Sequence, residues 1–271
     1  MPIDLPTEVL QQIVENHLAG GPTKWLKYCS LVCWQWRHVT LPVLMSKVVL
    51  TSVWTDHPPG GRLATAQDVQ QFAPFLSQYV RHIVVSTASQ QLRDDLDLHE
   101  ANDLFFAMLD VIPDFARLSR MTLSGDAILK ILGSGGTRLP NIYHFTVYRT
   151  GTTLPTKAIG TFTNLRILHL IGVSFNLNDV SAEWNRDPSE LNLPIPVIEE
   201  LALQLAVNPF VTFVKWACRT KMLDFSQLKI LKISMSDSEA ERQCFVDELV
   251  PLVEKKVETL DADIYSKLIQ A

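Results

Sequence analysis

Residue types that support catalysis or metal binding are present in this chain, but their spacing fits neither chemistry. The glycine-rich run at 133–136 is not followed by the Gly-Lys-Ser/Thr of a phosphate-binding loop, so we interpret it as a turn. The chain contains no Gly-x-Ser-x-Gly or His-Glu-x-x-His pattern. Cys29 and Cys33 are four residues apart, yet no Cys-x-x-Cys motif or nearby histidine pair completes a zinc site. We therefore expect no enzyme activity, no cofactor and no metal site.

Composition and charge are those of an ordinary folded protein. Of the 271 residues, 47% are hydrophobic and 20% are charged, which supplies enough apolar material for a substantial core. With a net charge of −5, the chain lacks the basic character that nucleic acid binding needs. It does not open with a secretory leader, and no apolar run approaches the roughly 18 residues of a membrane helix. We expect an intracellular, soluble protein of the cytoplasm or nucleus, without nucleic acid or membrane partners.

The segment 3–42 carries more apolar side chains than a piece of that length can bury by itself. Over 6–18, apolar residues recur at the three- and four-residue spacing of an amphipathic helix. Two further short helices are expected over 24–28 and 33–38, and Pro42 should close the group. The surplus of apolar surface predicts a protein partner.

This segment resembles the F-box, whose pattern is a Leu-Pro-x-Glu opening, an apolar helix, a Leu-Val-Cys-x-x-Trp-Arg core and a closing proline. The chain departs from the pattern at Trp34 and at Gly20-Gly21, and neither change breaks the apolar spacing. The resemblance implies docking on the Skp adaptor of a cullin-RING ubiquitin ligase. The residues assigned to adaptor contact are Leu5, Pro6, Glu8, Val9, Leu10, Ile13, Leu31, Val32, Cys33, Trp36 and Arg37. The alternative is a helical cap that buries these side chains against its own chain.

A six-residue pattern with apolar residues at positions one, four and six recurs along the rest of the chain. Its copies begin at Val80, Leu118, Ile142, Leu165, Ile198, Leu228 and Val257. The distance between the starts of successive copies fits the leucine-rich-repeat period of roughly 20–29 residues if some copies carry insertions. In a strand, positions four and six point to the core, whereas positions three and five point to the opposite face. The segments between copies that look helical are 66–79, 100–112, 128–132, 210–223 and 239–255.

These patterns predict an α/β fold. We expect a three-helix F-box at 1–44, a first strand and linker at 45–79, and an irregular leucine-rich-repeat-like solenoid at 80–271 with a curved parallel sheet and outer helices. The combination is similar to the leucine-rich-repeat-like regions that follow an F-box in fungal proteins. A doubly wound α/β domain is the alternative, because it also alternates strands with helices. The longest insertion, 174–196, contains Trp184, which either contacts a partner or tucks under its own loop.

The face made by positions three and five is the expected surface for a protein target. The residues assigned to target contact are His82, Arg120, Thr122, His144, Thr146, Ile167, His169, Glu200 and Lys232. Its three histidines belong to different copies and lack the local spacing of a metal site, so we expect them to meet solvent or a partner.

Taken together, these features predict the substrate-recognition subunit of an SCF-type (Skp adaptor, cullin, F-box) ubiquitin ligase. Such a subunit performs no chemistry, and it raises the effective concentration of an unknown protein target near the enzyme. A repeat scaffold that binds the adaptor without delivering a substrate is one alternative. An α/β enzyme with an unrecognised site is another.

Overall fold

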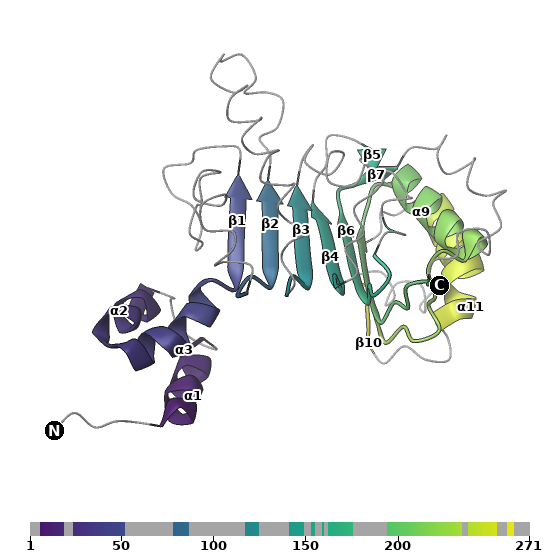
Figure 1. The fold of residues 1–271 in the computed structure, drawn as a ribbon. Coiled ribbons are helices and arrows are strands. Elements are labelled where there is room, and N and C mark those ends of the chain that lie inside the picture. The colour runs from purple at the N-terminus through teal and green to yellow at the C-terminus, as the bar shows by residue number, and fades with distance from the viewer. Residues whose placement is uncertain are drawn as a thin grey trace, which may run out of the picture.

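A computed structural model describes residues 6–18, 24–51, 78–86, 117–124, 141–148, 153–154, 159, 162–175, 194–234, 238–253 and 259–262. Three helices come first, namely α1 (Thr7–Leu18), α2 (Lys24–Val32) and α3 (Trp34–Leu44), and parallel strands follow them (Figure 1). The predicted helical segments at 100–112 and 128–132 and the insertion residue Trp184 lie outside the described residues, as does the predicted helical segment 66–79 up to residue 77. Residues 78 and 79 form a turn.

The second and third helices are separated by a single residue. Cys33 adopts an extended conformation, with φ −158° and ψ 172°, and its carbonyl accepts a hydrogen bond from the Arg37 N–H at 3.0 Å. The prediction that Pro42 ends the third helix was wrong, because α3 runs through it to Leu44. Proline removes one backbone donor, but the Met45 N–H still reaches the carbonyl of Leu41 at 2.9 Å and closes the last turn.

Eight strands form one all-parallel sheet whose strand order follows the chain (Figure 1). The strands are β1 (Lys47–Thr51), β2 (His82–Ser86), β3 (Arg120–Ser124), β4 (His144–Tyr148), β6 (Ile167–Ile171), β8 (Glu200–Gln204), β9 (Ile230–Ser234) and β10 (Thr259–Ala262). Each of the seven predicted copies contains one of these strands. A doubly wound sheet reverses its order at a switch point, and the described strands contain no such reversal.

One backbone arrangement is repeated at each junction from β1 to β9. The carbonyl at position two of a copy accepts hydrogen bonds from the N–H groups at positions two and three of the next copy. For example, the Ser46 carbonyl accepts from Arg81 and His82, both at 2.9 Å. The carbonyls of Arg81, Ser119, Tyr143, Arg166 and Glu199 make the same pair of bonds. The six-residue pattern is therefore a repeated backbone structure as well as a repeated sequence.

The strand at the N-terminal edge is a copy that the pattern search did not include. Ser46 takes the role of position two, and Lys47 pairs in register with His82. Met45, Val48 and Leu50 accordingly fall at positions one, four and six. Val48 belongs to the sheet core and Met45 packs against it, so the first copy starts directly after α3.

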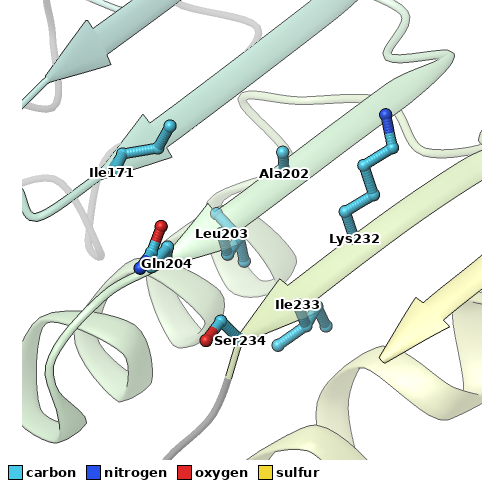
Figure 2. A pocket seen from close by; sticks show the side chains of 7 residues that line it. All are labelled: Ile171, Ala202, Leu203, Gln204, Lys232, Ile233 and Ser234. Carbon is cyan, nitrogen blue, oxygen red and sulfur yellow. The ribbon is translucent and has the colours of Figure 1, made fainter. Parts of the chain in front are cut away.

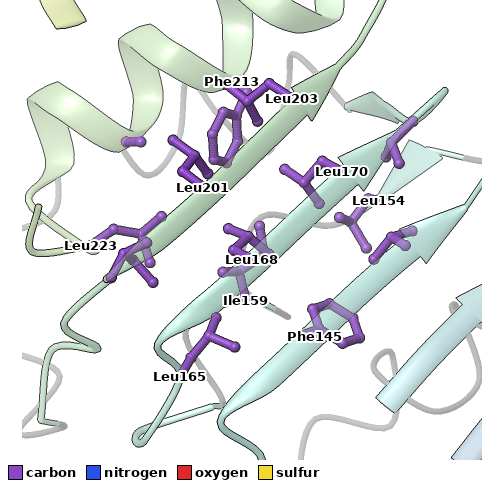
Figure 3. Close-up of a cluster of buried hydrophobic side chains, with 14 of the residues drawn as sticks. Phe145, Leu154, Ile159, Leu165, Leu168, Leu170, Leu201, Leu203, Phe213 and Leu223 are labelled. Carbon is purple, nitrogen blue, oxygen red and sulfur yellow. The ribbon is translucent and has the colours of Figure 1, made fainter. Parts of the chain in front are cut away.

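The core lies on the face predicted from positions one, four and six. In the six copies that start between Val80 and Leu228, every residue at these positions is at most 3% exposed. Figure 3 shows part of this layer, with Phe145, Leu168 and Leu201 on neighbouring strands. The prediction of the buried face is confirmed for those copies, and the side chains of the seventh copy lie outside the described residues.

Helices cover the core face at the C-terminal end of the sheet. Helix α9 (Val207–Thr220) places the Phe213 ring over Leu201 and Leu203, with its centroid 5.4 Å from that of Phe175 (Figure 3). The chain then forms α10 (Glu239–Cys244), the π-helical turn η4 (Phe245–Leu249) and α11 (Val250–Val253). The helical predictions for 210–223 and 239–255 are thus confirmed to within a few residues. A two-stranded sheet, β5 (Thr153–Leu154) with β7 (Ser174–Phe175), completes the described elements.

The N-terminal helices have a core of their own. Leu10, Val14 and Val39 form a second buried cluster, with Trp36, Val43 and Leu44 packed partly buried against it. We call α1, α2 and α3 the helical head. Among the described helices, none combines the length and the apolar character needed to cross a bilayer.

The alternation of burial can be tested with two adjacent residues of β6. Leu168 lies at position four and is fully buried, whereas Ile167 lies at position three on the opposite face. We expect Leu168→Ala to lower the free energy of unfolding by about 2–5 kcal/mol, because it leaves a cavity. Ile167→Ala should cost about 1 kcal/mol or less. Urea unfolding followed by circular dichroism measures both, and equal losses would contradict the assignment of the two faces.

Candidate functional site

The helical head divides the residues predicted to contact an adaptor into two groups. Leu10 is 1% exposed and Trp36 is partly buried, so both contribute to the core of the head. Pro6, Glu8, Val9, Ile13, Leu31, Val32, Cys33 and Arg37 are exposed. Leu5 lies outside the described residues. A partner that docks on this head would therefore meet Leu31 and Val32 first, and would not reach Leu10.

Six large apolar side chains on the head are exposed, and we call them the apolar rows. They are Val9, Ile13, Tyr28, Leu31, Val32 and Trp34. Val9 and Ile13 are four residues apart on α1, and Tyr28, Leu31 and Val32 are three and four apart at the end of α2, so each set shares one face of its helix. Leu31 is 81% exposed and Trp34 is 75% exposed. Single exposed apolar residues are ordinary, but rows of them on so small a module indicate a binding surface.

Trp34 is the residue at which the chain departs from the F-box pattern. Its indole stacks on the imidazole of His38 with ring centroids 5.2 Å apart and an interplanar angle of 7°. His38 lies four residues further along the same helix, so the stack holds the indole along the outside of α3. From the sequence, Trp36 was predicted to contact the adaptor instead. The spacing of apolar residues does not show which of the two nearby tryptophans packs against the core of the head.

The sheet brings the residues predicted to contact a target onto one surface, which we call the polar face. It consists of positions three and five of β2 to β9. The register aligns His82, Arg120, His144, Ile167 and Glu200 in one row across adjacent strands. Thr122, Thr146 and His169 are aligned in the next row, and Lys232 extends it on β9. Thr146 is only 8% exposed, so it supports its neighbours more than it meets solvent.

Hydrogen bonds link neighbouring side chains of the polar face. His82 Nε2 and Thr122 Oγ1 form a hydrogen bond of 3.0 Å, and His144 Nε2 and Thr146 Oγ1 form one of 3.2 Å. The rings of His144 and His169 meet edge to face, with centroids 4.9 Å apart.

At the β6–β9 end of the polar face, the carboxylate of Glu200 links two neighbouring side chains. Glu200 Oε1 accepts from His169 Nε2 at 3.0 Å and from Lys232 Nζ at 2.8 Å. The face is therefore a preordered polar layer, with side chains that hold one another in place.

Burial, together with nearby positive charges, lowers the pKa of two imidazoles on this face. Burial, followed by the charges of Arg120 and Lys47, lowers the pKa of His82 from 6.5 to about 4. Burial and then Arg120 and His169 lower the pKa of His144 to about 4, although Glu200 opposes this shift. Both imidazoles are therefore neutral at pH 7.

Glu200 shows the opposite balance of effects. Burial alone would raise the pKa of its carboxyl, but hydrogen bonds from Lys232 and His169, together with their charges, hold this pKa below the usual value. The carboxylate thus stays ionised and compensates the cation beside it.

A shallow hollow of about 190 Å³ lies near the C-terminal ends of β6, β8 and β9. Ile171, Ala202, Gln204, Lys232 and Ser234 line it together with Leu203 and Ile233. Figure 2 shows the short side chain of Ala202 and the long side chain of Lys232, two residues that pair in register on β8 and β9. The hollow is too small for a cofactor-sized ligand, since such sites are about 300–1,000 Å³. It has room for one apolar side chain of a partner.

Within the described residues, no three His, Cys, Asp or Glu side chains are grouped so that they could hold a metal ion. Burial raises the pKa of the Cys218 thiol to about 12, so this cysteine is a protonated, packed side chain at pH 7.

Comparisons with family models, with curated proteins and with solved structures found no match for this chain.

The depressed histidines make stability depend on pH in a defined window. Between pH 6.5 and 4 the unfolded chain takes up protons at His82 and His144 while the native protein does not, so the free energy of unfolding should fall as pH falls. The loss should be on the order of 1–3 kcal/mol per imidazole after allowance for solvent screening. Urea midpoints at pH 7 and 4.5 measure it. The double variant H82Q/H144Q should lose less stability over this range, and an unchanged pH dependence would contradict the assignment.

Proposed function

We propose that this protein is the substrate-recognition subunit of an SCF-type ubiquitin ligase. In this proposal the helical head is an F-box that docks on a Skp adaptor, and the sheet with its outer helices is an irregular leucine-rich-repeat-like solenoid that holds a protein target. The single observation that carries the proposal is the set of apolar rows on a head whose own core is complete without them.

The energetics of the head support the adaptor role. Leu10, Val14 and Val39 are already buried, so the exposed side chains of α2 have no remaining core to enter. Burying a Leu or Val side chain at an interface is worth about 1.5–3 kcal/mol. Tyr28 and Trp34 add aromatic anchors of the type that dominates protein interfaces. The resemblance of this segment of the sequence to the F-box supports the adaptor as the partner.

The repeated backbone arrangement supports the solenoid. Consecutive strands that pair in chain order, with the same pair of hydrogen bonds at each junction, are what stacked repeats require. Each copy buries its apolar positions against the next, which leaves positions three and five free for a target. A target held there is carried to the ligase by the head, so the protein acts by raising the local concentration of the target and needs no catalytic residue.

The adaptor role can be tested by co-purification. The double variant L31D/V32D places two charges in the α2 row, at positions that are 81% and 70% exposed, so the protein should still fold. We expect affinity for the Skp adaptor to fall by about 30-fold or more, which corresponds to losing hot-spot residues. The matched control is V246D, an exposed apolar residue on η4 that should bind the adaptor as the unmodified protein does. Equal binding by all three proteins would contradict the proposal.

A second measurement separates a substrate receptor from a scaffold. Proteins that co-purify with the full chain should be ubiquitinated when adaptor, cullin and RING subunits are added, and this modification should be lost with L31D/V32D. Adaptor binding without any such modification would favour the scaffold.

A further inference from the structure

We infer that the part of the polar face on β2 to β4, together with Lys47 beside it on β1, binds an acidic segment of the target, through a row of basic side chains with which no carboxylate of the described residues forms an ion pair. The row consists of Lys47, His82, Arg120 and His144, and we call it the basic row. This inference rests on the proposed target-binding function of the face and specifies the chemistry of the target.

The two halves of the sheet differ in whether their cationic side chains form ion pairs among the described residues. On β6 to β9, Lys232 pairs with Glu200 at 2.8 Å, and Glu199 takes both Arg166 at 2.9 Å and Lys229 at 3.4 Å. Each of these cations has a carboxylate supplied by the first residue of β8 or by the residue just before it.

At the strands β1 to β4, Lys47, Arg81 and Arg120 are all exposed, and no carboxylate of the described residues forms an ion pair with any of them. Among the described residues, this half of the sheet therefore presents a positive surface, although the whole chain carries a net charge of −5. A cationic surface on an acidic protein selects an anionic ligand by charge complementarity.

Register fixes the geometry of the basic row. Lys47, His82, Arg120 and His144 pair with one another as position three of four adjacent strands. Strands lie about 4.8 Å apart, so Lys47 and Arg120 are separated by roughly 10 Å. In an extended segment, carboxylates two or four residues apart share one face and lie roughly 7 or 13 Å apart, a range that the long side chains of Lys47 and Arg120 can reach. Arg120 can take one carboxylate in a bidentate manner, and Lys47 can take the second.

The two histidines support the row without competing for the ligand. His82 is held by Thr122 and His144 by Thr146, so both rings are fixed beside Arg120. Because both are neutral at pH 7, the positive charge at this pH comes from Lys47, Arg81 and Arg120. Three cations form too small a footprint for nucleic acid, which needs many phosphate contacts. An acidic protein segment is the occupant that fits.

The test uses the full chain and two fluorescein-labelled octapeptides, one alternating Glu with Ser and one alternating Gln with Ser. Fluorescence anisotropy should detect binding of the Glu peptide alone, weakening as salt is raised from 50 to about 200 mM. R120Q should weaken it about tenfold or more, since a charge-assisted pair is lost, and R120K should restore part of the affinity. K229Q is the matched control, because Lys229 is an exposed cation already paired with Glu199, and it should bind as the unmodified protein does.

Three results would overturn the inference. They are equal binding of the Glu and Gln peptides, equal losses in R120Q and K229Q, and displacement of the Glu peptide by a short single-stranded RNA at lower concentration than by unlabelled Glu peptide. The measurement needs no adaptor, so L31D/V32D should leave it unchanged. If the protein binds the Glu peptide but not the adaptor, the ligase proposal is wrong and the inference about the basic row stands. If it binds the adaptor but not the Glu peptide, only the inference about the basic row is wrong.

Discussion

The parallel register between consecutive strands is the constraint on which the other features of this protein depend. At each junction from β1 to β9, the position-two carbonyl of one copy takes two N–H groups of the next, so a copy cannot shift along its neighbour without breaking both bonds. A shift by one residue would also turn every core side chain toward solvent. The same register that closes the core aligns His82, Arg120 and His144 in one row on the opposite face. The buried core and the polar face are thus two consequences of the same strand pairing.

The helical head follows a different principle. A small module can bury only a few side chains, and here Leu10, Val14 and Val39 use that capacity. The apolar side chains at the end of α2 are left exposed to water. Because α3 continues directly into the first copy of the sheet, a partner bound to the head is attached to the sheet without an intervening linker.

Much of the sheet could be predicted from the sequence, because the pattern of positions one, four and six reports the two-residue period of a strand directly. The strand at the N-terminal edge was predicted, but it was not recognised as a copy of the six-residue pattern, although Val48 and Leu50 occupy its positions four and six. The two-residue strands β5 and β7 have no periodicity to detect.

The site was less predictable than the sheet. The spacing of apolar residues identifies the apolar stripe of α1, but it does not show which of them are buried in the core of the head. It therefore could not distinguish buried Leu10 from exposed Ile13. Lys47 was missed because β1 was left out of the series. An ion pair between strands, such as that of Lys232 with Glu200, forms only between copies that are neighbours in the sheet. The strand order is known only from the fold.

The most direct test of the central claim is amide hydrogen exchange of the full chain with and without the Skp adaptor. If the head is the docking element, peptides covering 24–34 should exchange more slowly in the complex, while those covering 198–234 in the sheet should be unchanged. Protection confined to the sheet, or no protection in the head at an adaptor concentration that forms the complex, would contradict the account.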